Sequence, residues 1–166
     1  MFFTATQEIS VLRHREPMIA QAIVALQRRA YKVEADLLDF PALPPLKESP
    51  AVIMASGEIF YGLTSRTGLL AMLATESMPD RVVISRLCVS PSSTRRGYAT
   101  RLIRHILGHT EQPILVTTGA ANEPALMLYR GMGFTDFEKH ETVEGLKLIT
   151  LRYLPHRASV SGSHGD

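Results

Sequence analysis

The most regular hydrophobic pattern in the chain lies in its second half. Apolar residues recur at helical spacing over 99–107, while arginine and histidine side chains take the opposite face. A stripe at positions i, i+3, i+4 and i+7 is typical of an amphipathic helix that packs one face on a core. The pattern predicts a helix that begins at or near Thr94 and is ended by Gly108.

Continuous apolar runs predict strands on either side of this helix. Residues 82–89 (VVISRLCV) have no purely polar face, which is typical of a central strand buried on both sides. A shorter run at 114–118 follows the helix, so strand, helix and strand form a right-handed crossover unit. Upstream, residues 58–63 and 69–75 flank a turn-forming segment and predict an antiparallel hairpin.

Weaker patterns fill in the rest of the chain. Besides the hairpin and the crossover unit, we expect a strand over 2–11, helices over 17–30 and 33–38, a proline-rich loop over 40–50 that is ordered or forms a mobile cover, a helix over 124–130, and strands over 134–140 and 146–153. The tail from His156 is rich in Ser, Gly and His, and we expect it to be disordered over 156–166. Residues 1–155 are then one mixed α/β domain.

Composition narrows the class of protein. The chain has 166 residues, 45% of them apolar and 20% charged, which fits one globular domain of about 100–200 residues and excludes disordered, collagen-like and coiled-coil chains. The single cysteine, Cys88, excludes an intrachain disulfide and fits a reducing compartment. No apolar run reaches the roughly 18 residues of a membrane span, and the N-terminus lacks a secretory signal. We expect a cytoplasmic protein with no membrane partner.

Positive charge is concentrated in one window. The net charge is only +2, but residues 81–110 hold six arginines and no lysine, aspartate or glutamate. A local cationic field attracts a polyanionic ligand. Nucleic acid is one such ligand, but we rank it last because the chain has no recognisable reader module and no aromatic residues interleaved with the arginines.

The start of the predicted helix has the features of a phosphate site. A helix N-terminus presents unpaired backbone N–H groups and a partial positive charge. Gly97 leaves room for a close approach of the backbone, and Arg95 and Arg96 add forked donors. Neither a Walker A nor a dinucleotide fingerprint is present. The alternative is a capped helix with ordinary surface arginines.

A second segment decides between these readings. Residues 122–134 read NEPALMLYRGMGF, and with the block at 94–99 (TRRGYA) the chain resembles the GNAT superfamily of N-acetyltransferases. That family has a loop of the form [Q/R]-x-x-G-x-[G/A] and a later segment N-x-x-A-x-x-L-Y-x-x-x-G-F. The one departure is Thr94, where the family has Gln or Arg. The resemblance covers residues 82–153.

The resemblance implies a fold and a co-substrate. The fold is a mixed, mainly antiparallel sheet of six or seven strands, flanked by about four helices and splayed at the central strands. Acetyl-CoA would lie in the splay, with its pantetheine arm on backbone groups of one strand and its pyrophosphate on the N–H groups of 95–100. The residues expected to bind it are Leu87, Cys88, Val89, Thr94, Arg95, Arg96, Gly97, Tyr98, Ala99, Thr100 and Asn122. Asn122 could instead serve as a helix N-cap.

The resemblance also implies a reaction, transfer of the acetyl group directly to a primary amine. Tyr129 is the expected catalytic residue, because a phenol near the sulfur can protonate the departing thiolate; the alternative is a core tyrosine. The sequence does not identify a general base. Glu76, Glu123, the residues at the strand ends, a water relay and an amine that arrives neutral all stay open. A lone cysteine such as Cys88 is usually a small buried hydrophobe, so a covalent acetyl-enzyme is not expected.

The acceptor is expected to be a small-molecule or peptide amine. Its pocket would be built by the first helical region, loop 40–50 and the turn after His140. An apolar wall could include Tyr31, Phe40, Phe60 and Tyr61, but core packing explains these four residues equally well. A non-catalytic acyl-CoA sensor is the alternative function. His105 and His109 lack further ligands nearby, so no metal is expected. A homodimer is possible.

Overall fold

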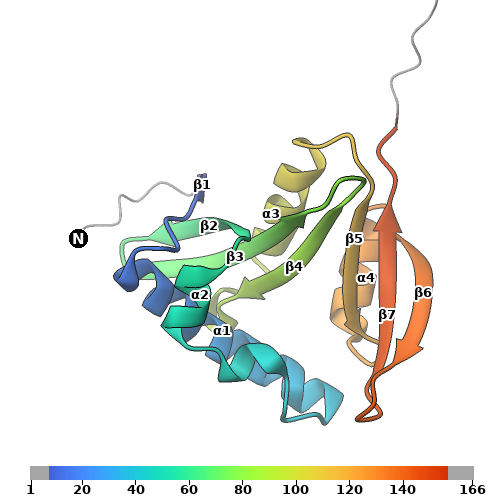
Figure 1. The fold of residues 1–166 in the computed structure, drawn as a ribbon, viewed down its shortest axis with the longest axis horizontal. Coiled ribbons are helices and arrows are strands. Elements are labelled where there is room, and N and C mark those ends of the chain that lie inside the picture. Colours follow the sequence, from blue (N-terminus) through green and yellow to red (C-terminus); the bar gives the residue numbers. More distant parts are fainter. Residues whose placement is uncertain (1–7, 157–166) are drawn as a thin grey trace, which may run out of the picture.

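One seven-stranded sheet organises the described part of the chain. The computed structural model describes residues 8–156, and the strand order is β1-β2-β3-β4-β5-β7-β6 (Figure 1). The elements are β1 (Ile9–Val11), α1 (Pro17–Leu38), the 3-10 turn η1 (Pro44–Lys47), α2 (Pro50–Ala55), β2 (Ile59–Ser65), β3 (Gly68–Ser77), β4 (Val82–Val89), the 3-10 turn η2 (Pro91–Ser93), α3 (Tyr98–Leu107), β5 (Ile114–Gly119), α4 (Glu123–Gly131), β6 (Thr135–Glu141) and β7 (Lys147–Tyr153).

The order of strands and helices is the predicted one, but the second helix is a different segment. The two helices expected over 17–30 and 33–38 are one continuous helix, α1, which ends where Asp39 adopts a left-handed conformation. No Gly or Pro interrupts it, so nothing stops the helix between the two predicted pieces. The second helix is α2, which begins at Pro50, a residue suited to the first helical turn. Part of the proline-rich loop is the ordered turn η1.

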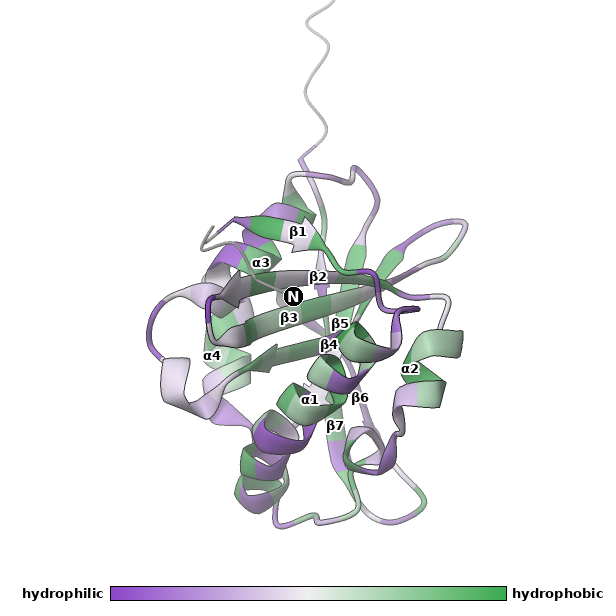
Figure 2. Ribbon diagram, turned by 90° about the vertical axis from the view of Figure 1, so that its left-hand side faces the viewer, coloured by the Kyte–Doolittle hydropathy of each residue, from purple (hydrophilic) through white to green (hydrophobic). Residues whose placement is uncertain are grey.

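The helices cover both faces of the sheet and create two cores. One core joins α3 and α4 to the sheet and includes Leu102, Ile103 and Leu126. The other joins α1 and α2 to the opposite face and includes Ile23, Ile53 and Phe60. In Figure 2 the apolar sides of α1 and α2 turn toward the sheet. The sheet is therefore buried on both faces in its centre, as the run at 82–89 predicted.

The sheet is not closed along its centre. β4 and β5 are parallel, and their register covers only 82–84 against 114–116. A β-bulge interrupts the pairing of β4 with β3, so that Arg86 pairs with Ala74, Ile84 pairs with Thr75, and Ser85 is the extra residue between them. A bulge bends its strand, and beyond Ile84 the two central strands diverge (Figure 1). This confirms the predicted splay.

α3 begins later than the sequence predicts. Thr94 is not its first residue: the chain makes the turn η2, passes through 94–97 without helical structure, and enters α3 at Tyr98. Two residues in this loop have positive φ, Arg95 at 65° and Gly97 at 76°. The helical pattern alone could not detect such a loop, because periodicity carries no information about left-handed backbone.

The ends of the chain add little to the picture. The strand expected over 2–11 is present at Ile9–Val11, and its first part lies outside the described residues. The expected disordered tail over 156–166 also lies outside them, apart from His156. No helix among residues 8–156 is long and apolar enough to cross a membrane.

Candidate functional site

The predicted phosphate loop lines an open cavity. The cavity has a volume of about 430 Å³ and lies between the end of β4, the loop before α3 and the start of α4. It is lined by Val89, Ser93, Thr94, Arg95, Gly97, Tyr98, Ala99, Thr100, Pro124 and Leu128. Most of the predicted loop residues are therefore brought together. Arg96 is exposed and does not line this cavity.

Backbone geometry makes the loop suited to an anion. The first backbone donor of α3 with a partner in the helix is the N–H of Arg101, which reaches the Gly97 carbonyl at 3.0 Å. The N–H groups just before it are the orphan donors of a helix start. Gly97 has φ 76°, and an added Cβ would meet no protein atom within 4 Å. A side chain here would strain the backbone and project into open space.

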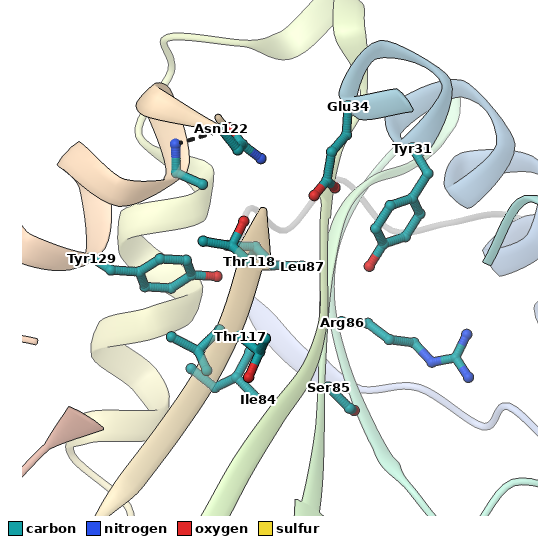
Figure 3. Close-up of a pocket in the computed structure, with 12 residues that line it drawn as sticks. Tyr31, Glu34, Ile84, Ser85, Arg86, Leu87, Thr117, Thr118, Asn122 and Tyr129 are labelled. Atoms are coloured by element: carbon teal, nitrogen blue, oxygen red, sulfur yellow. Dashed lines mark hydrogen bonds between the residues drawn. The ribbon is translucent and has the colours of Figure 1, made fainter. Parts of the chain in front are cut away.

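A second cavity lies in the gap between β4 and β5. Its volume is about 110 Å³, and it receives side chains from both faces of the sheet (Figure 3). It is lined by Tyr31, Glu34, Ile84, Ser85, Arg86, Leu87, Val116, Thr117, Thr118, Asn122, Ala125 and Tyr129. Leu87 lines this cavity and Val89 lines the first one, while the side chain of Cys88 belongs to the core under α1. The two cavities are neighbours along β4 and α4.

Tyr129 is both a core residue and a cavity residue. It is 3% exposed, and its ring packs edge-on against Phe134 at 5.4 Å between centroids. In Figure 3 its hydroxyl points away from α4 toward the gap. Burial and the nearby carboxylate of Glu34 raise the pKa of the phenol, so the hydroxyl keeps its proton at neutral pH. The side chain is a proton donor held in a fixed position.

Asn122 performs the capping role that the sequence left open. Its side-chain oxygen accepts a hydrogen bond from the Ala125 backbone N–H at 3.3 Å, at the start of α4. The side-chain amide nitrogen is left to face the cavity, where it lies toward Glu34 (Figure 3). The cap therefore fixes the orientation of a donor that lines the gap. Its contact with pantetheine stays a prediction.

Arg86 is the centre of a buried charge cluster. Its guanidinium donates to Glu58 at 2.7 Å, to both oxygens of Glu48 at 2.7 and 2.9 Å, and to Gln27 at 2.7 Å. The Arg86 side chain is 11% exposed and those of Glu48 and Glu58 are 17% and 8% exposed. This cluster joins β4 to α1, to β2 and to the segment after η1. It holds the proline-rich segment in place, so the ordered reading of that segment is the correct one.

Glu34 is the residue that the sequence analysis missed. It lies on α1, lines the gap cavity, and points its carboxylate toward the gap from the face opposite Tyr129 (Figure 3). Partial burial raises the pKa of this carboxyl, and the facing amide of Asn122 acts in the opposite direction. The two glutamates considered from sequence, Glu76 and Glu123, are exposed and line neither cavity. The sequence did not indicate Glu34, because its position over the gap depends on α1 being one continuous helix.

The close packing of α1 on β5 places Glu34 over the gap. A Cβ added to Gly119, the last residue of β5, would come within 2.5 Å of the Leu38 side chain at the end of α1. A larger residue at this position would require the Leu38 side chain to move. The C-terminal turn of α1 thus reaches from β4 across to β5. The hydrophobic patterns of α1 and β5 do not indicate this contact.

Cys88 is unsuited to a covalent route. It is 1% exposed, and burial raises the pKa of its thiol to about 12. A protonated, inaccessible thiol is a poor nucleophile. We expect Cys88→Ala to keep transfer activity within about threefold, and intact-mass spectrometry of the wild type after incubation with acetyl-CoA alone to show no added acetyl group. A stable acetyl adduct that is missing from Cys88→Ala would contradict direct transfer.

The structure separates the four aromatic residues considered for the acceptor wall. Of these four only Tyr31 lines the gap cavity. Phe60 is fully buried beneath Arg86, and Tyr61 packs against His105 on the opposite face of the sheet. Phe40 lines none of the cavities described here. The wall was inferred from residue type alone. The side chain of Phe60 is buried, so core packing explains why an aromatic residue stands there.

The rings of His105 and His109 pack against each other. Their ring centroids are 4.0 Å apart. Within residues 8–156 no group of three or more His, Cys, Asp or Glu side chains is placed to hold a metal ion. The absence of a metal requirement stays a prediction.

Comparison with known proteins agrees with this geometry. The family model for the acetyltransferase (GNAT) family matches residues 23–134. The UPF0157 protein YqkA of Bacillus subtilis is 33% identical over 151 residues, which cover 90% of this chain and 44% of that protein. The chain thus spans less than half the length of this relative.

Solved structures share the fold at low sequence identity. The ribosomal-protein-S18-alanine N-acetyltransferase from Escherichia coli superposes with a TM-score of 0.71 and 20% identity, covering 93% of this chain and 97% of that chain. An N-acetyltransferase from Staphylococcus aureus Mu50 has a TM-score of 0.70 and 15% identity, covering 90% and 98%. PaiA N-acetyltransferase from Thermoplasma acidophilum, solved with coenzyme A, has a TM-score of 0.68 and 12% identity, covering 88% and 99%. With a family model that matches most of its length, this chain belongs to the GNAT family of acetyltransferases.

Proposed function

We propose that the protein transfers the acetyl group of acetyl-CoA directly to a primary amine. The observation that carries this proposal is the arrangement of the two neighbouring cavities. One is bordered by a helix start with orphan N–H groups, and the other holds the Tyr129 hydroxyl in the gap of the sheet. Their order along β4 matches the order of pyrophosphate, pantetheine and thioester in acetyl-CoA.

The expected binding residues divide between the parts of acetyl-CoA. The loop and the first turn of α3, from Thr94 to Thr100, would hold the pyrophosphate through backbone N–H groups. Within residues 8–156 the side chains of Arg95 and Arg96 make no hydrogen bond or ion pair, so they are available to phosphate oxygens. Backbone groups of Leu87, Cys88 and Val89 on the side of β4 that β5 has left would pair with the pantetheine amides, as in strand addition.

The chemistry asked of the protein is proton transfer and positioning. The amine nitrogen attacks the carbonyl carbon, a C–N bond forms and the C–S bond breaks. Tyr129 would give its proton to the leaving sulfur, for which a neutral phenol is required. Burial raises the pKa of Tyr129, so its hydroxyl is in the protonated form that this step needs over the whole neutral range.

The increase in stability on acetyl-CoA binding is a first test, and its expected magnitude can be stated. At about 100 times its dissociation constant, acetyl-CoA should add roughly 2.7 kcal/mol of stability, seen as a rise in Tm that ATP and NAD do not reproduce. We expect Gly97→Val to reduce this shift, because a β-branched residue is strained at φ 76° and fills the space of the loop. Gly57→Val, at a glycine with open space around it and no positive φ, is the control.

Turnover separates an enzyme from a sensor. Release of free thiol from acetyl-CoA is to be measured with a panel of amines that includes a dipeptide, lysine, a polyamine and an aminoglycoside. Thiol release with at least one amine supports the transferase. A full thermal shift without release by any amine would favour the non-catalytic acyl-CoA sensor. The amine acceptor, the cytoplasmic location and a homodimer all stay predictions.

A further inference from the structure

The Glu34 carboxylate lacks a cationic partner. Within residues 8–156 the ion pairs involve other carboxylates, namely Glu16, Glu48, Glu58, Asp80 and Asp136. Glu34 is partly buried in the gap cavity. Charges removed from water are normally paired, so this carboxylate is a site for a cation that the chain does not itself supply.

The nearest cation is already used. Arg86 lines the same cavity, but its guanidinium makes four hydrogen bonds to Glu48, Glu58 and Gln27. In Figure 3 the Arg86 side chain points away from the Glu34 carboxylate. Its partners are Gln27 on α1, Glu48 before α2 and Glu58 before β2. The single positive charge of Arg86 is shared by the carboxylates of Glu48 and Glu58. It therefore does not neutralise the charge of Glu34.

The end of α1 adds to the negative field. Glu34 lies in the last two turns of α1, where helix carbonyls carry a partial negative charge. The last turn of the helix has no basic residue, and Asp36 and Asp39 are exposed beside it. Lys32 is exposed one turn earlier on the same helix. The last turn itself therefore presents Asp36, Asp39 and the helix carbonyls to a ligand that approaches the gap from the α1 face.

We propose that Glu34 binds the acceptor as an alkylammonium ion and takes the proton that frees its nitrogen for attack. The inference rests on the proposed acetyl transfer and names the class of its acceptor: an amine that is charged in water at neutral pH. Glu34 and Tyr129 lie on opposite sides of the gap, which places the proton acceptor on the α1 face and the proton donor on the α4 face.

The protons balance in this scheme. The carboxylate of Glu34 takes one proton from the ammonium group, and the neutral nitrogen forms the C–N bond. Tyr129 protonates the sulfur as the C–S bond breaks. The nitrogen loses its second proton to solvent as the amide forms, and solvent reprotonates Tyr129. Glu34 finally releases its proton to water, so one proton is released for each amide made.

The scheme predicts a rate that rises with pH through the pKa of Glu34. The groups that face it are Tyr31 on its own helix, Asn122 and Tyr129 on α4, and Cys88 and Arg86 on β4. Burial raises the pKa of Tyr31, Tyr129 and Cys88, and Arg86 stays charged, so none of them titrates near neutrality. The raised pKa of Glu34 places the acid limb of kcat/KM above the usual carboxylate range.

Two acceptors, one positively charged and one neutral at pH 7, test the proposal. Ethylamine is protonated at pH 7 like a lysine side chain, whereas hydroxylamine is neutral there. In Glu34→Gln we expect kcat/KM for ethylamine to fall by about 100-fold or more, the range of a lost general base. Transfer to hydroxylamine should stay within about threefold, after subtraction of the uncatalysed reaction, and the dissociation constant of acetyl-CoA should not change.

Matched variants separate this effect from a loss of fold. Glu111→Gln, at an exposed carboxylate that lines neither cavity, should leave both rates unchanged. Glu34→Asp should regain part of the ethylamine rate. A raised carboxyl pKa means that the charged form costs folding free energy above that pKa, so Glu34→Gln should be at least as stable as the wild type at neutral pH.

A binding measurement does not depend on turnover. In protein labelled with ¹³C-glutamate and saturated with CoA, ethylammonium chloride should shift the carboxyl signal that Glu34→Gln lacks, and sodium chloride of equal ionic strength should not. The proposal is overturned if this signal does not respond, or if Glu34→Gln loses both acceptors equally or neither. If the wild type acetylates neither amine, the proposed transfer fails on these acceptors and the NMR titration alone decides whether Glu34 binds ammonium.

Discussion

Replacing Tyr129 with phenylalanine is expected to lower kcat by about 100- to 10,000-fold, the usual contribution of a positioned general acid. The ring packs in the core against Phe134, and the hydroxyl makes no hydrogen bond to any residue of the described chain. Its removal therefore leaves the packing intact. Acetyl-CoA affinity should change by less than about threefold, because the pyrophosphate loop lies in the other cavity.

Steady-state kinetics with an amine found active in the panel, together with calorimetric titration of acetyl-CoA, measures the two quantities separately. Tyr153→Phe is the matched control, because Tyr153 packs against the same Phe134 and does not line the gap cavity. Equal turnover in wild type and Tyr129→Phe would remove the phenol from the mechanism. Equal losses in the two tyrosine variants would point to packing.

The second large effect concerns stability. Arg86→Met is expected to lower the free energy of unfolding by about 3–5 kcal/mol, because it leaves the carboxylates of Glu48 and Glu58 buried without their cation. Urea denaturation at pH 7 measures the loss. Gln27 would lose its partner as well. The segment after η1 should become sensitive to proteolysis, since Arg86 is what fastens Glu48 to the sheet.

The companion variant decides whether unpaired charge is the cause. Arg86→Met combined with Glu48→Gln and Glu58→Gln should recover much of the lost stability, since a neutral cluster of similar volume carries no uncompensated charge. Arg130→Met is the control, because the Arg130–Asp136 pair lies on the surface with side chains 43% and 37% exposed; we expect about 1 kcal/mol or less there. A loss below about 1 kcal/mol in Arg86→Met would show that the cluster is not a significant source of stability.

Local patterns predicted most of the fold. The boundaries of β4 agree with the run at 82–89, because a strand buried on both faces is apolar throughout and Pro91 ends it. The hairpin of β2 and β3 and the order of all elements were also predicted. α1 was predicted as two pieces, 17–30 and 33–38, although no Gly or Pro separates them.

The candidate site was predicted only where it is local in sequence. The loop before α3 and the Asn122–Tyr129 segment each lie within a few residues, so a motif can describe them. Glu34 shares the gap with Tyr129 only because the bulge at Ser85 opens the sheet and Gly119 lets the end of α1 pack on β5. Those contacts join residues far apart in the chain, so the hydrophobic periodicity of a single segment cannot predict them.

The most direct test of the central claim is a crystal structure of the protein with CoA. The account predicts the diphosphate at the N–H groups around Gly97, the pantetheine arm along β4 where β5 has diverged, and the sulfur within about 3–3.5 Å of the Tyr129 hydroxyl. CoA bound elsewhere on the protein, or bound in the loop with its sulfur pointing away from the gap, would contradict it.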